Sequence, residues 1–101
     1  MPPSEDDPLF ELPIDGTLDL HAFAPGDVAS VVEEYLRECR ARGILSVRVV
    51  HGRGKGVQRA VVRRALAALT FVVSSRDAPP ESGGWGATLV RLRAPDHERE
   101  P

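Results

Sequence analysis

The stretch SVRVVHGRGKGVQRAVVRRAL, residues 46–66, joins three kinds of local pattern. Its first residues are β-branched at alternate positions, which is typical of a strand. The glycines of HGRGKG then break any regular structure. From there on, apolar residues recur at helical spacing and predict a helix over about residues 57–69. Its expected buried stripe consists of Val57, Val61, Val62, Ala65, Leu66 and Leu69.

A strand and a helix are also predicted on the N-terminal side of this stretch. TLDLH, residues 17–21, alternates apolar and polar side chains, with Leu18 and Leu20 toward a core. A helix is expected next, and Gly43 is placed to end it. A helical crossover between two strands favours their parallel pairing. The buried stripe expected for this helix is Val28, Val31, Val32, Tyr35, Leu36 and Cys39.

Two further strands are predicted on the C-terminal side. FVVSS, residues 71–75, and ATLVRL, residues 87–92, are separated by the breaker-rich loop RDAPPESGGWG. The element order is therefore βαβαββ. Two helices cannot cover both faces of a four-stranded sheet, so we expect an α/β two-layer sandwich: a four-stranded mixed sheet with two helices on one face.

The uncovered face of this sheet should carry the polar side chains of the strands. Alternation along the strands places Asp19 and His21, Arg48, and Arg91 with Arg93 on that face. A carboxylate, an imidazole and three guanidinium groups on one surface outline an anion-binding site.

Charge is segregated along the chain, although its formal net charge is only -2. Residues 1–16 carry five acidic residues and no Lys or Arg, and residues 95–101 carry three acidic residues and Arg99. Residues 17–94 hold twelve Lys and Arg against seven Asp and Glu. We expect a basic domain over residues 17–94 and largely disordered acidic tails over 1–16 and 95–101.

Composition excludes several classes of protein. Cys39 is the only cysteine, so a disulfide framework and a CxxC metal cluster are both excluded. No apolar run is long enough for a signal peptide or a membrane span. We expect a cytoplasmic protein without membrane partners, monomeric and small enough for one core.

The basic turn HGRGKG has the features of a phosphate cradle. Gly52, Gly54 and Gly56 let backbone N–H groups approach a phosphate in front of a helix N-terminus. Arg53 and Lys55 add positive charge. The turn matches neither a Walker A loop nor a GxGxxG fingerprint, which favours the phosphate of a polynucleotide over that of a nucleotide.

Three motifs follow one another in an informative order. LDLH at residues 18–21, HGRG at 51–54 and GGWGAT at 83–88 resemble the small MutS-related (Smr) domain, over about residues 17–92. The resemblance is to short, stand-alone bacterial members. It implies a fold like the C-terminal domain of a bacterial translation initiation factor, and nucleic-acid binding. Members are variously endonucleases on DNA or RNA, some fused to mismatch-repair-like ATPases and some acting on messenger RNA at ribosomes.

The resemblance also implies roles for particular residues. Asp19 and His21 correspond to the suspected catalytic pair, and the turn from His51 to Gly54 to a nucleic-acid contact. Arg59 corresponds to an arginine of the helix that follows this turn.

The chemistry of phosphodiester cleavage accommodates these residues. An imidazole is able to act as a base or an acid, so His21 is a candidate for either proton transfer. Asp19 is able to orient that ring or to bind a divalent cation such as Mg²⁺ or Mn²⁺, although one carboxylate is few for a two-metal site. His51 is the candidate second proton carrier. Arg53, Lys55 or Arg91 would stabilise the charge of the transition state.

Simpler roles remain open for the same residues. Asp19 and His21 also fit a hydrogen bond that locks the end of a strand, and HGRGKG a plain turn. Arg59 and Arg63 fit a solvated helix face, and Trp85 fits either a base-stacking contact or a plug for its own loop. Three functions follow: an endonuclease for DNA or RNA, a nucleic-acid- or ribosome-binding module that cuts nothing, or a protein-interaction domain for an acidic partner.

Overall fold

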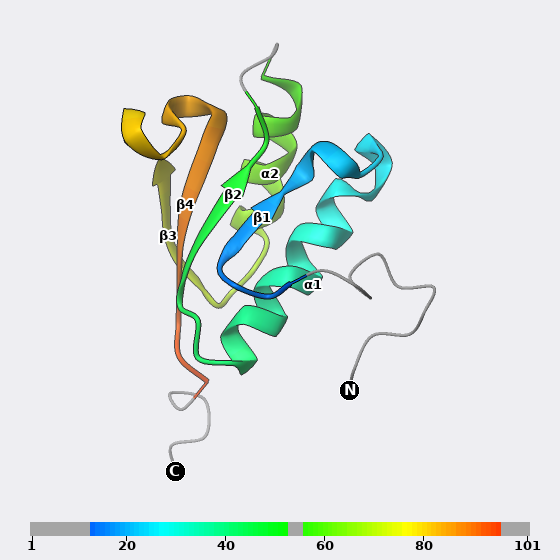
Figure 1. Ribbon diagram of the computed structural model, residues 1–101. Coiled ribbons are helices and arrows are strands. Elements are labelled where there is room, and N and C mark those ends of the chain that lie inside the picture. The colour runs from blue at the N-terminus through cyan, green and yellow to red at the C-terminus, as the bar shows by residue number, and fades with distance from the viewer. Residues whose placement is uncertain (1–12, 53–55, 96–101) are drawn as a thin grey trace.

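The computed structural model describes residues 13–52 and 56–95 (Figure 1). A four-stranded sheet runs in the order β1-β2-β4-β3, and two helices, α1 and α2, lie on one of its faces. β1 is parallel to β2, and β4 lies antiparallel between β2 and β3. This confirms the predicted two-layer fold. The elements are β1 Thr17–Asp19, α1 Val28–Ala41, β2 Ser46–Val50, α2 Val57–Ala67, β3 Val72–Asp77 and β4 Ala87–Leu92.

Four short 3₁₀ turns complete the described chain. Two of them, η1 and η2, connect β1 to α1, and the other two, η3 and η4, connect β3 to β4. Their bounds are η1 Leu20–Ala22, η2 Pro25–Asp27, η3 Pro80–Ser82 and η4 Gly84–Gly86. Neither α1 nor α2, nor any other helix within the described residues, is long and apolar enough to cross a membrane.

Helix α1 follows its predicted pattern closely. All six residues of the predicted stripe are buried. The helix ends at Ala41, and Gly43 caps it as predicted, with a φ of +80° that glycine adopts at little cost. Gly43 donates its N–H to Arg40 O at 3.1 Å, and Ile44 donates to Cys39 O at 2.8 Å, the two bonds of a Schellman motif.

Helix α2 departs from its prediction at both ends. It ends at Ala67, two residues before the predicted end at Leu69. Val57 is 65% exposed and does not belong to the buried stripe, because it opens the helix one turn before the residues that reach the core. Val62 and Leu66 carry the buried stripe, with Val61, Ala65 and Leu69 packed beside them.

Two strands also differ from their predicted bounds. The first ends at Asp19, because the chain turns into η1 at Leu20. The third runs from Val72 to Asp77, two residues further than predicted, and Phe71 precedes it as a buried core residue. The predicted acidic tails fall mostly on residues 1–12 and 96–101, which lie outside the described residues.

The two faces of the sheet have different side chains. Strand residues on the helix-covered face join the helices in the hydrophobic core: Leu18, Val47, Val49, Val90 and Leu92. On the opposite face, Arg48 pairs in register with Leu89, and Leu89 pairs with Arg76. Helices cover only one face, so the other presents its polar side chains to solvent, as predicted (Figure 1).

The hydroxyl of Tyr35 fixes the start of β1. Tyr35 is fully buried on α1, and its hydroxyl accepts the N–H of Gly16 at 3.1 Å. The same hydroxyl donates to Thr17 O at 3.0 Å. Both backbone groups of this edge strand are thereby satisfied from the helix layer, which sets the position of Asp19 two residues further on.

Candidate functional site

An aspartate and a histidine form a hydrogen-bonded pair at the end of β1. Asp19 Oδ1 lies 2.6 Å from Nδ1 of His21 and accepts the backbone N–H of His21 at 2.9 Å. Aspartate two residues before a turn commonly makes this backbone contact, which also explains why the strand stops here. Both side chains remain about two thirds exposed, at 64% for Asp19 and 65% for His21.

The pairing sets the protonation of both groups. A carboxylate only accepts, so the proton of the neutral ring belongs on Nδ1, and Nε2 keeps a free lone pair. The backbone N–H of His21 is the main reason that the pKa of Asp19 lies below its usual 3.8; partial burial opposes this, and the His21 ring and Arg48 add to it. Asp19 is therefore ionised near neutral pH, with the open nitrogen of His21 turned away from it.

Gly52 lies directly beside that open nitrogen. A Cβ built on Gly52 would be 3.1 Å from Nε2 of His21. Gly52 also has a φ of +83°, a conformation that disfavours other residues. The fold thus brings the LDLH and HGRG motifs into contact, and a side chain at position 52 would crowd the His21 ring.

The third motif holds this turn from the other side. The backbone N–H groups of His51 and Gly52 both donate to Gly86 O, at 3.0 and 2.8 Å. Nε2 of His51 is 2.9 Å from the hydroxyl of Thr88, and Nδ1 is 3.0 Å from Gly52 O. GGWGAT therefore serves as the support on which the HGRG turn rests.

His51 faces the interior, unlike His21. Its side chain lies on the helix-covered side of the sheet and the residue is only 6% exposed. Burial lowers the pKa of His51 below 6.5; the bond to Gly52 O opposes this, and Arg59 and Arg63 favour it. With both nitrogens occupied, the arrangement favours a positioning role over the second proton carrier expected from the sequence. The sequence did indicate this burial, because His51 continues the period-two alternation of the buried residues Val47 and Val49.

Arg48 connects the open face to the η3 turn. Its Nη1 donates to Ser82 O at 3.0 Å, close to Gly83. Arg48 therefore stabilises the approach to GGWGAT and also contributes positive charge near Asp19.

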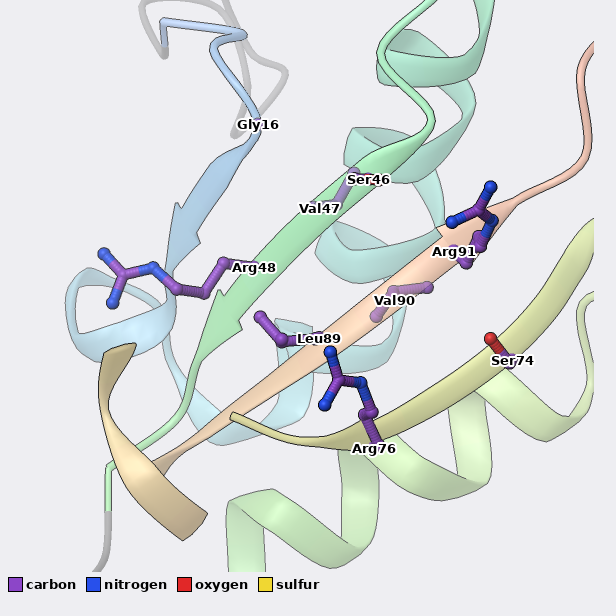
Figure 2. Close-up of a pocket in the computed structure, with 9 residues that line it drawn as sticks. All are labelled: Gly16, Ser46, Val47, Arg48, Ser74, Arg76, Leu89, Val90 and Arg91. Atoms are coloured by element: carbon purple, nitrogen blue, oxygen red, sulfur yellow. The ribbon is translucent and has the colours of Figure 1, made fainter. Parts of the chain in front are cut away.

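Arg91 lies on the same face, further along β4. It borders a shallow pocket of about 250 Å³ on the open sheet face (Figure 2). Arg93 was also expected on this face. It follows Leu92, the last residue of β4, and its Nη1 donates to Thr70 O.

A second cluster lies at the start of α2. Nη2 of Arg59 contacts both carboxylate oxygens of Asp77 at 2.8 and 3.0 Å, and Nη2 of Arg63 contacts Oδ1 at 2.7 Å. The hydrogen bonds from Arg59, followed by the one from Arg63, lower the pKa of Asp77 below 3.8. Both arginines are thus ion-paired while their side chains stay partly exposed, at 29% for Arg59 and 40% for Arg63. Asp77 itself was missed, because its partners are 18 and 14 residues away and leave no local pattern.

Trp85 belongs to the same cluster. The Arg59 guanidinium lies 5.6 Å from the centre of the Trp85 ring, and a Cβ on Gly56 would be 4.0 Å from that ring. Trp85 is 45% exposed, so part of its surface faces solvent. The ring is held beside the N-terminus of α2 and remains accessible. Arg53, Gly54 and Lys55, expected to contact phosphate, lie outside the described residues.

Within residues 13–52 and 56–95, no three His, Cys, Asp or Glu side chains gather as they would to hold a metal ion. The pair of Asp19 and His21 offers two donors at most. The described donor set therefore does not match a dedicated site for Mg²⁺ or Mn²⁺, which prefer several oxygen ligands.

The fold is a two-layer α/β sandwich, and it brings three sequence motifs together next to the exposed imidazole of His21. These two features define the class of domain. The Smr domain model matches residues 18–93, and the chain belongs to the Smr domain family. Endonuclease MutS2 of Thermus thermophilus is 40% identical over 76 residues, which are 75% of this chain and 10% of that protein. Endonuclease MutS2 of Caldicellulosiruptor saccharolyticus is 33% identical over 85 residues, 84% of this chain and 11% of that protein. The chain thus spans about a tenth of these relatives.

Two solved structures have the same fold. The crystal structure of the Smr domain of Thermus thermophilus MutS2 superposes with a TM-score of 0.73 at 38% identity, covering 78% of this chain and 99% of that one. YdaL, a stand-alone small MutS-related protein from Escherichia coli, also gives a TM-score of 0.73, at 27% identity, covering 77% of this chain and 64% of that one.

Proposed function

We propose that this Smr domain binds polynucleotides and cleaves their phosphodiester bonds, with DNA or RNA as the substrate. The observation that carries the proposal is the exposed imidazole of His21, whose Nδ1 is held by Asp19 and whose Nε2 opens beside Gly52. The similarity to proteins named Endonuclease MutS2 supports it.

The proposed cleavage uses His21 for both proton transfers. Nε2 takes the proton of the attacking oxygen, from water or a ribose 2′-hydroxyl, as that oxygen bonds to phosphorus. The bond from phosphorus to the leaving oxygen then breaks, and the leaving oxygen takes the proton back from the imidazolium, directly or through water. Asp19 stabilises the imidazolium between the two transfers and keeps Nε2 directed at the substrate.

Positive charge and backbone donors hold the phosphate in this proposal. Arg48 lies near Asp19 on the open face, and Gly52 and Gly56 flank the basic turn whose Arg53, Gly54 and Lys55 would add donors and charge. His51 positions the turn and moves no proton. The proposed proton transfers use only side chains of this chain.

A cleavage screen tests the proposal. Purified protein is incubated with labelled single-stranded, duplex and branched forms of DNA and RNA, with magnesium or EDTA. At least one polymer should be cut by wild type and not by Asp19→Asn with His21→Gln, the double variant being checked for native circular dichroism. Cutting by this folded variant at the wild-type rate would show that a contaminant or another site is responsible.

A binding module that cuts nothing is the second candidate. Within the described residues, Asp19 is the only titratable side chain hydrogen-bonded to the His21 ring. The site therefore lacks a second acid or base at this ring, which favours binding without cleavage. In that case wild type and the double variant would bind RNA or DNA equally, and neither would cut any substrate of the screen. The ribosome would then be tested by co-sedimentation with the two proteins.

A further inference from the structure

The open face of the sheet carries two rows of side chains, of which the proposed cleavage uses only Arg48. Three residues from β2, β4 and β3 lie side by side in each row. The register gives one row as Arg48, Leu89 and Arg76, and the next as Ser46, Arg91 and Ser74. All six line one shallow pocket of about 250 Å³ (Figure 2).

The three arginines of these two rows differ in their partners. Arg59 and Arg63 are both paired with Asp77, and Arg48 donates to Ser82 O. Within the described part of the chain, Arg76 and Arg91 have no ion-pair partner, and both are exposed. The face therefore presents uncompensated positive charge over β4 and β3.

We infer that this face is a second phosphate-binding site, which holds the single strand that adjoins the bond cut at His21; the inference rests on the proposed function. Arg76, to which no role was given above, and Arg91 would each contact a phosphate, while the side chains of Ser46 and Ser74 offer hydroxyl donors. Leu89 is only partly buried between two guanidinium groups. An unpaired base can pack against such a surface, and a paired base cannot.

The geometry relates this site to His21. Asp19 pairs with Val50, and Val50 with Ala87, so the row of Asp19 is the next one along the strands after that of Arg48. Each row advances by two residues, about 6.6 Å, so the row of Arg91 lies about 13 Å from that of Asp19. A dinucleotide has one internucleotide phosphate and is therefore too short to occupy both sites.

The test measures binding of a labelled 12-nucleotide single strand and of a dinucleotide, in a His21→Gln background that prevents cutting. Arg76→Gln and Arg91→Gln should each weaken the 12-mer by roughly threefold to tenfold and lower the slope of log affinity against log salt by about 0.7. Affinity for the dinucleotide should not change. Arg64→Gln is the control, since it removes one exposed charge from α2, in the other layer.

Each outcome decides the question. If Arg76→Gln and Arg91→Gln bind the 12-mer like Arg64→Gln, the inference is overturned, whether or not wild type cuts. If wild type cuts nothing but these two variants lose affinity, the binding site stands and the nuclease proposal fails. The NMR signals of Arg76 and Arg91 are also followed during addition of the 12-mer and of a peptide of residues 1–16. If they shift with the peptide and not with the 12-mer, the face binds an acidic protein segment and the inference is overturned.

Discussion

Gly52 is the residue at which two of the motifs touch. An added Cβ would meet Nε2 of His21 at 3.1 Å, and the φ of +83° is unfavourable for any other residue. Two separate effects are therefore expected from Gly52→Ala: a backbone penalty of about 1 kcal/mol and displacement of the His21 ring.

Gly43 provides the matched control. Its φ is +80°, but a Cβ there would meet nothing within 4 Å. Gly52→Ala and Gly43→Ala should lower the free energy of unfolding by similar amounts in urea titrations. Only Gly52→Ala should reduce cleavage, by tenfold or more, and shift the NMR signals of His21. Equal cleavage by the two variants would mean that Gly52 does not set the position of the ring.

The pH dependence of stability should report on buried His51. Burial lowers its pKa in the folded protein below 6.5. As the pH falls through 6.5, the unfolded chain therefore binds a proton that the folded chain refuses, and stability declines. The decline stops once the pH falls below the folded pKa. Asp19, with a lowered pKa, adds a second decline below pH 3.8.

His51→Gln isolates the first of these declines. Because glutamine does not titrate, the variant should be less stable at pH 8 and should show a flatter dependence of unfolding free energy as the pH falls below 6.5. Urea titrations at closely spaced pH values measure this slope. A variant with the wild-type slope would show that another group, rather than His51, causes the decline.

At the scale of single elements, β1 is a three-residue strand whose position depends on α1. Tyr35→Phe removes the hydroxyl that pairs Gly16 N and Thr17 O, and it leaves both backbone groups without that partner. We expect the free energy of unfolding to fall by about 1–2 kcal/mol. Cleavage should fall as well, because Asp19 follows directly in the same strand.

Asp15→Asn is the comparison for this change. Asp15 is 3.4 Å from the Tyr35 hydroxyl and also accepts the N–H of Thr17, an acceptor that asparagine retains. Its stability, measured in the same chemical denaturation, should stay close to that of wild type. If Tyr35→Phe is equally stable, the hydroxyl does not fix β1.

Most of the fold could be predicted from the sequence because its elements have strong periods. The stripe of α1 was predicted in full, since amphipathic helices repeat over several turns. Element ends were predicted less well: β1 stops at Asp19 because a side chain captures the backbone of His21. Such a bond depends on a single residue and produces no repeating pattern in the sequence.

The site was predictable only as far as its motifs. LDLH and HGRG pointed to Asp19, His21 and Gly52, whose proximity requires the parallel pairing of β1 with β2. The contacts of Arg59 with Asp77 and of Arg48 with Ser82 depend on tertiary packing across 18 and 34 residues. No local pattern encodes partners at such separations.

At the scale of the whole molecule, the two layers separate support from chemistry. The helix-covered face buries His51 and the core, His21 is exposed just after the end of β1, and Arg48 and Arg91 lie on the open sheet face. Residues 17–94 carry an excess of basic residues. Affinity for a polynucleotide should accordingly fall steeply as salt is raised, because bound cations are released from its phosphates.

The most direct test of the account is single-turnover cleavage of the best substrate at saturating protein, with wild type and His21→Gln compared. The account predicts a rate at least about a hundredfold lower for His21→Gln, the size expected for loss of a general acid–base. Its dissociation constant for the uncut substrate should stay within about twofold of wild type, since the proposal assigns phosphate binding to the arginines and the backbone donors. A folded His21→Gln protein that cuts at the wild-type rate would contradict it.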